Sequence, residues 1–334
     1  MREGCGLNSA QIPIALFSVS FSKVRGTRIA LVNNRIYNLS SWTMDRIASA
    51  FRARYLDTHE KYLDSIATLL GACNNHTSLA TGAFMLRHVI SVKTICLQMR
   101  ALNSFDEARA IRNLRNSWYH ECALNYPQDL DDRLKFAPWK IIQFFYAIYS
   151  ALSAIVRCLD NRPNLRQQVA LNEFTTQVII SPPTRLVPAP LCFYLRGGAI
   201  SPSPPLVVSW PYGLSCHVPN VQRCLESLHP TSTRPVTLFH YFKSLRDWAN
   251  YEDSYIFINL FGPAVISMLD SSLKKIVQGF FPFAEVFLIS FYGWDIVHDQ
   301  FQQFSQRIVR NLKIEPASLI SRFAEYARCS ALVS

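Results

Sequence analysis

Apolar side chains recur every three to four residues over two long parts of the chain, a period typical of packed helices. In the first part this pattern predicts four helices, near 42–72, 78–101, 105–122 and 136–158. Their short connections favour an antiparallel bundle. The same period returns at Val236 and continues to about Arg328, which predicts a second helical unit.

The N-terminal residues alternate apolar and polar positions, a pattern typical of strands. Residues 29–39 contain the dipeptide Asn33-Asn34, which tolerates positive φ and therefore predicts a hairpin turn. The runs Phe174–Ser181 and Leu206–Trp210 predict two further strands. The expected fold class is α+β, mainly α: an antiparallel helical bundle with N-terminal strands, a proline-rich β/loop insert and a C-terminal helical unit.

Proline separates the two helical parts. Twelve of the 18 prolines lie between residues 163 and 235, and at that density edge strands and loops are permitted but long helices are not. The chain is expected to divide into an N-terminal β-hairpin arm (1–41), a helical bundle (42–160), a proline-rich β/loop segment (161–235) and a C-terminal helical unit (236–334).

The formal net charge is +11, and the resulting positive field favours polyanionic partners. Residues 1–55 carry eight basic and only two acidic side chains, among them Arg28 and Arg54 as candidate nucleic-acid contacts. Nucleic-acid phosphates are natural partners of such a surface. Charge alone is equally consistent with a basic protein that binds no nucleic acid.

The nine cysteines are scattered and form no CxxC pair, which favours a reducing, cytoplasmic location over a disulfide framework. A zinc site built from Cys216, His217, Cys224 and His229 is a minor alternative, because their spacing fits no common zinc motif. We therefore expect neither a metal nor another cofactor.

Three apolar stretches, at 141–156, 254–269 and 275–294, raise the question of a membrane. The first two are shorter than the roughly 20 residues that span a bilayer. The third is interrupted by Pro282 and Glu285. We expect buried core helices and no membrane insertion.

The helix expected near 105–122 carries the most informative polar residues. Successive residues advance by about 100° around a helix axis, so Arg112, Arg115, Asn116, Tyr119 and His120 fall on one side. The neighbouring flank, expected to face the core, contains Ile111, Leu114, Trp118 and Cys122. A wall of cations, an amide, a phenol and an imidazole suits the binding of a phosphodiester and proton transfer on it.

The spacing from Arg115 to His120, with the polar Asn116 directly after the arginine, resembles the motif of the HEPN superfamily. Members of that family are small helical bundles, and many are ribonucleases. An apolar helix rich in small residues follows their motif, as Phe144–Leu152 does here. The resemblance covers roughly residues 42–160.

The resemblance implies a metal-independent endoribonuclease in which the ribose 2′-OH attacks the phosphate and leaves a 2′,3′-cyclic phosphate. His120 would be the general acid or base, and Arg115 with Arg112 would stabilise the negative charge of the phosphorane. Asn116 would orient the imidazole or donate to a phosphate oxygen. It also implies RNA as the substrate, a homodimer through the 42–160 bundle, a role as toxin or defence effector, and a neutralising or regulatory protein as a further partner.

A second hypothesis gives these residues structural roles. His120 is then a partly buried structural histidine, and Arg112 and Arg115 are solvated charges or partners of Glu107 and Glu121. The chain would be a non-catalytic helical module that binds nucleic acid or protein. Placement of the histidine and the arginines in an open groove favours the enzyme, and burial in intrachain salt bridges favours the module.

Overall fold

The computed structural model describes residues 19–24, 27–32, 35–38, 57–72, 107–126, 130–159, 166–180, 187–201, 214–228, 234–252, 263–312 and 316–330. The chain divides into two compact units, residues 1–55 and 56–334. Helices dominate the described residues, and the strands form two small antiparallel sheets. The expected class, α+β and mainly α, is confirmed.

The first unit contains a three-stranded antiparallel sheet in the order β1-β2-β3. Its strands are β1 (Val19–Val24), β2 (Thr27–Val32) and β3 (Arg35–Asn38). Val32 pairs with Arg35, so the β2–β3 turn falls at the predicted Asn33-Asn34. The hairpin expected from the alternating pattern is confirmed.

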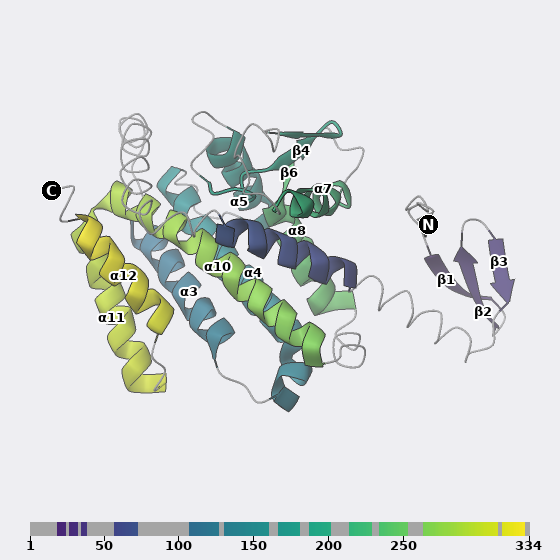
Figure 1. Ribbon diagram of the computed structural model, residues 1–334, viewed down its shortest axis with the longest axis horizontal. Helices are drawn as coiled ribbons and strands as arrows, with labels where there is room; N and C mark the ends of the chain where they lie inside the picture. Colours follow the sequence, from purple (N-terminus) through teal and green to yellow (C-terminus); the bar gives the residue numbers. More distant parts are fainter. Residues whose placement is uncertain are drawn as a thin grey trace, which may run out of the picture. The chain divides into compact units, whose positions relative to one another are not determined.

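The second unit begins with a helix at residues 57–72, followed by α3 (Glu107–Asn125) and α4 (Leu130–Leu159). Helices α3 and α4 agree with the helices expected near 105–122 and 136–158, and residues 57–72 agree with the described part of the helix expected near 42–72, of which residues 42–56 lie outside the described residues. The helix expected at 78–101 lies outside the described residues. Pro138 lies inside α4. Figure 1 shows α3, α4 and α10 running alongside one another.

The strand expected at Phe174–Ser181 is wrong. Helix α5 (Gln167–Phe174) continues directly into a π-helical segment, η1 (Thr175–Ile180). Thr175, Val178 and Ile179 are buried there, so these β-branched side chains are accommodated by packing in the helical core rather than by a partner strand. The strand expected at 206–210 lies outside the described residues.

The proline-rich segment contributes β4 and β5 to a second small sheet, whose order is β5-β4-β6. Its strands are β4 (Tyr194–Arg196), β5 (Ala199–Ser201) and β6 (Val236–Thr237). Gly197 and Gly198 form the β4–β5 turn at φ values of 58° and 81°, which a residue with a Cβ adopts only at a cost.

Helices form most of the remaining described chain. They are η2 (Ser215–His217), α7 (Val218–Glu226), α8 (Leu238–Asp247), η3 (Trp248–Glu252), α10 (Pro263–Tyr292), α11 (Trp294–Leu312) and α12 (Ala317–Ser330). Gly293, at φ 100°, separates α10 from α11. The helical C-terminal part expected from the pattern after Val236 is confirmed.

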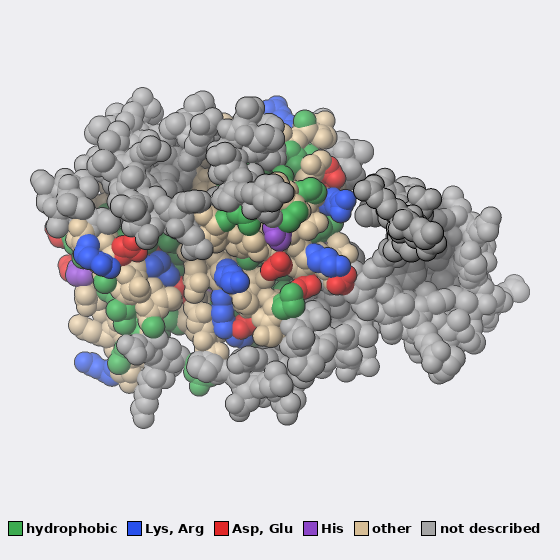
Figure 2. Space-filling model, in the orientation of Figure 1, with side chains coloured by type: hydrophobic (Ala, Val, Ile, Leu, Met, Phe, Trp, Pro, Cys, Tyr) green, Lys and Arg blue, Asp and Glu red, His purple; other side chains and the backbone are tan. Residues whose placement is uncertain are grey.

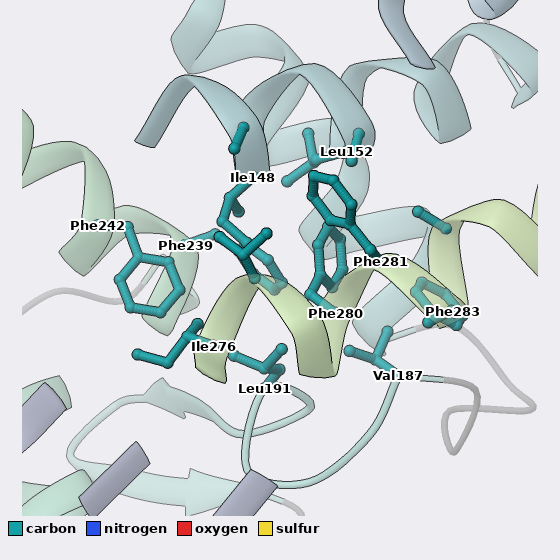
Figure 3. Packing of buried hydrophobic residues seen from close by; sticks show 14 of the residues in the cluster. Ile148, Leu152, Val187, Leu191, Phe239, Phe242, Ile276, Phe280, Phe281 and Phe283 are labelled. Atoms are coloured by element: carbon teal, nitrogen blue, oxygen red, sulfur yellow. The ribbon is translucent and has the colours of Figure 1, made fainter. Parts of the chain in front are cut away.

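One cluster of buried side chains runs through the second unit, from Tyr62 to Tyr326. Figure 3 shows Ile148 and Leu152 of α4 packed in one cluster with Phe239 of α8 and with Phe280 and Phe281 of α10. Loop residues of the proline-rich segment join the same cluster. The expected bundle, proline-rich segment and C-terminal helices therefore share a core, and the four-part division of the chain stays a prediction.

Within the described part of the chain, two helical segments are long and apolar enough to cross a bilayer, Pro138–Leu159 and Ser267–Tyr292. In their most apolar windows 78% and 72% of the residues are buried inside the protein. This is weak evidence for a membrane span, because a core helix of a folded domain passes the same test.

Candidate active site on helix α3

The polar residues of the motif occupy the solvent side of α3. Arg112, Asn116 and Tyr119 are exposed, and Arg115 and His120 are partly buried at its two margins. The flank expected to face the core is buried throughout: Ile111, Leu114, Trp118 and Cys122. The amphipathic pattern thus placed the helix correctly, with its hydrophobic flank inward and the five candidate residues on the other side.

His120 is held by two side chains of α4. Its Nδ1 lies 2.7 Å from Oε1 of Gln143, and its ring stacks on Tyr146 with a centroid separation of 5.6 Å and an angle of 27°. Because an amide oxygen only accepts, Nδ1 must be the donor. Within the described part of the chain Nε2 has no partner, so in the neutral ring Nε2 carries the available lone pair.

The ring of Tyr146 is in turn contacted by a buried cation. The guanidinium carbon of Arg246 on α8 lies 5.6 Å from the Tyr146 ring centre and 4.9 Å from that of Phe145. Arg246 also pairs with Asp247 at 2.9 Å and donates to Gln167. These contacts connect the platform beneath His120 to α5 and α8.

The opposite margin of the site faces α11. Tyr119 packs edge-on against Phe304 with ring centres 4.8 Å apart. Arg115 precedes Tyr119 by one helical turn and shares this margin, whereas His120 faces α4. Five residues correspond to about 140° around the helix axis, so Arg115 and His120 flank the exposed face, with Asn116 between them.

A buried ion cluster fixes α3 from behind. Arg322 of α12 binds both oxygens of Glu121, at 2.7 and 2.8 Å, and both oxygens of Glu285 on α10, each at 2.9 Å. Both carboxylates are buried. Burial alone disfavours the cation, but the charges and hydrogen bonds of the two glutamates raise the pKa of Arg322 above its ordinary value.

Neutral donors complete this cluster. Trp118 donates to Oε1 of Glu285 at 2.9 Å, Tyr326 donates to its Oε2 at 2.7 Å, and Ser318 donates to Glu121 at 3.1 Å. Burial, together with the nearby Glu285 carboxylate, raises the pKa of Tyr326, so this phenol remains a donor. Glu121 is therefore committed to α12 and is not the partner of the exposed arginines.

The other two candidate contacts, Arg28 and Arg54, belong to the first unit. Arg28 pairs with Lys23 in the β1–β2 register of the first unit, and Arg54 lies outside the described residues. Sequence reasoning missed Gln143 and Tyr146, which position His120. Gln143 could have been identified from the sequence, because it is a polar residue within the apolar run at 141–156.

The zinc alternative finds no support among the described residues, where no group of three or more His, Cys, Asp or Glu side chains is placed to hold a metal. Cys216 is exposed and Cys224 is buried. His217 instead has Nδ1 3.1 Å from the hydroxyl of Ser65. The fourth candidate, His229, lies outside the described residues.

No protein-family model, curated protein or solved structure matches this chain. The evidence for its function therefore comes from the exposed side chains of α3. That face combines an imidazole with a defined donor and acceptor, an amide, and two guanidinium groups. In the described chain neither Arg112 nor Arg115 has an ion-pair or hydrogen-bond partner, so both can bind an external anion.

Proposed function

We propose that this protein is a metal-independent endoribonuclease of HEPN type whose active site is the exposed face of α3. The observation that carries the proposal is the orientation of His120. Gln143 fixes one ring nitrogen as donor, and the stack on Tyr146 fixes the ring plane. A general base needs such a defined lone pair within reach of its proton.

The reaction follows from these groups. Nε2 of His120 takes the proton of the ribose 2′-OH as its oxygen forms a bond to phosphorus. The bond from phosphorus to the 5′-oxygen breaks, and that oxygen leaves as a hydroxyl after receiving a proton. Arg115 and Arg112 neutralise the charge that accumulates on the phosphoryl oxygens, and Asn116 donates to one of them. The products are a 2′,3′-cyclic phosphate and a 5′-hydroxyl end.

One imidazole serves one of the two reacting oxygens most readily. We therefore propose a homodimer in which two α3 faces meet, so that a second copy of His120 protonates the leaving oxygen. A cytoplasmic location, a role as toxin or defence effector, and control by a neutralising protein belong to the same proposal.

The second hypothesis, a non-catalytic binding module, is favoured by one observation. His120 is partly buried and makes two well-defined contacts with α4, as a packing histidine also does. The two functions share the cationic face and differ in whether the imidazole moves a proton.

The test is incubation of the purified protein with total RNA in EDTA, comparing wild type with His120→Ala and Arg115→Ala. Arg328→Ala, an exposed arginine on α12, is the matched control. We expect cleavage by wild type and the control, and a loss of at least about a hundredfold in the two site variants. Cleavage that persists in both site variants refutes the site. Binding of RNA without cleavage by wild type favours the module.

A further inference from the structure

Basic and acidic side chains are interspersed among the described residues of the face drawn in Figure 2. The C-terminal half of α11 differs. From Phe301 to Leu312 it contains Arg307 and Arg310 and no acidic residue, and both arginines are exposed. Exposed amides accompany them: Gln302, Gln303, Gln306 and Asn311.

Ring contacts determine which flank of α11 faces α3. Phe301 stacks on Phe323 of α12 at 4.1 Å and meets Trp118 edge-on at 6.4 Å, whereas Phe304 lies closer to α3, at 5.4 Å from Trp118 and 4.8 Å from Tyr119. With about 100° per residue, the step from Phe301 to Phe304 turns away from α12. Arg307 is offset by about a further 60° in the same direction and lies on the flank of α11 next to Phe304. Arg310 is offset by about 120° from Phe304 and points outward from the same flank.

The direction of α11 follows from α12. Ser318 and Arg322 both bind Glu121, and Phe323 contacts Trp118 at 5.7 Å, so α12 runs antiparallel to α3. Figure 1 shows α11 running antiparallel to α12 and parallel to α3. Arg307 and Arg310 follow Phe304 along α11 and therefore lie past Tyr119, towards the C-terminal end of α3.

The adjoining face of α3 likewise lacks an exposed carboxylate after its first turn. Glu121 is buried and bound by Arg322. Among the described side chains of α3 and α11, the remaining acidic residues are Glu107 at the start of α3 and Asp295 and Asp299 in the first half of α11.

We infer that single-stranded RNA runs from the α3 face across Tyr119 onto the C-terminal half of α11, where Arg307 and Arg310 bind its phosphates. This rests on the proposed function and extends its substrate site. Arginines bind the backbone, the amides donate to and accept from sugars or base edges, and the exposed ring of Tyr119 stacks on an unpaired base. A duplex keeps its bases stacked and offers none for this ring.

The test measures binding rather than turnover. Fluorescein-labelled single-stranded RNA is titrated with protein that carries His120→Ala, so that no substrate is consumed. Arg307→Glu/Arg310→Glu is compared with the control Arg328→Glu on α12. We expect the double variant to bind at least about tenfold more weakly and to reduce the salt slope by about 1.4 for two lost phosphate contacts. The control is expected to retain the affinity of the parent.

Arg307→Gln/Arg310→Gln removes the charge without reversing it and should reduce the salt slope to the same extent. Equal affinities of the double variant and the control overturn the inference, as does absence of RNA binding or a preference for a duplex of the same sequence. The two proposals fail separately. RNA binding that depends on Arg307 and Arg310 without cleavage by wild type removes the ribonuclease alone. Cleavage with an unchanged KM in Arg307→Glu/Arg310→Glu removes this surface alone.

Discussion

Removal of Arg322 should destabilise the fold more than almost any other single truncation. Its guanidinium makes four hydrogen bonds to two buried carboxylates. At about 1.5–3 kcal/mol for each bond to a charged group, the four would amount to about 6–12 kcal/mol. Bonds within one network are not additive, so the range of about 3–5 kcal/mol found for breaking a buried ion pair sets the expectation.

The assay is urea denaturation of Arg322→Ala, followed by circular dichroism at neutral pH. The control is Lys61→Ala, which breaks an exposed pair with Asp57 at 2.7 Å and should change the free energy of unfolding by less than about 1 kcal/mol. Replacing all three charges, as in Arg322→Met with Glu121→Gln and Glu285→Gln, should recover most of the loss.

Equal stabilities of Arg322→Ala and Lys61→Ala would refute the reasoning. If the triple replacement does not recover the lost free energy of unfolding, the loss is due to packing of the arginine stem and not to buried carboxylates without a cation.

Three further outcomes are expected. Burial lowers the pKa of His59 to about 4, so as the pH falls through about 6.5 the unfolded chain binds a proton before the folded protein does. Up to about 3 kcal/mol of the free energy of unfolding should therefore be lost between about pH 6.5 and pH 4. Chemical denaturation of His59→Gln, which lacks this titration, should show a smaller loss. Gln143→Leu should lower kcat for RNA cleavage on the order of tenfold. In the same variant, nitrogen NMR should show that His120 loses its preference for the Nδ1–H tautomer. An unchanged tautomer would refute the role of Gln143. Burial, together with the Glu121 carboxylate, raises the pKa of Cys122 to about 12, whereas Cys216 is exposed. Mass spectrometry at pH 8 should therefore find Cys216 alkylated long before Cys122. Equal rates of alkylation would contradict the packing of α3.

The sequence pattern correctly predicted the elements that are determined by residues close together in the chain. The buried flank of α3 follows from a helical period, and the β2–β3 turn follows from two residues that tolerate positive φ. It failed at residues 174–181, where a run of β-branched side chains indicates a strand. Their environment is the core formed with neighbouring helices, and tertiary packing overrides a propensity worth no more than about 1 kcal/mol per residue.

The contacts that complete the site were beyond local reasoning. Arg322 lies 201 positions from Glu121 and 37 from Glu285, and no periodicity in the chain relates them. The partner of His120 is 23 positions away on the next helix. Sequence reasoning could therefore place the histidine on the correct side of a helix, but it could not find the amide that orients the ring.

The ion cluster behind α3 also has a use in protein engineering. Because the buried side chains Glu121 and Trp118 bind this helix to α12 and α10, its outward-facing side chains contribute little to holding it in position. Residues 112, 115, 116 and 119 can be randomised together as a display library while the scaffold holds their backbone in place. Selection from such a library would report directly on which ligands this surface accepts.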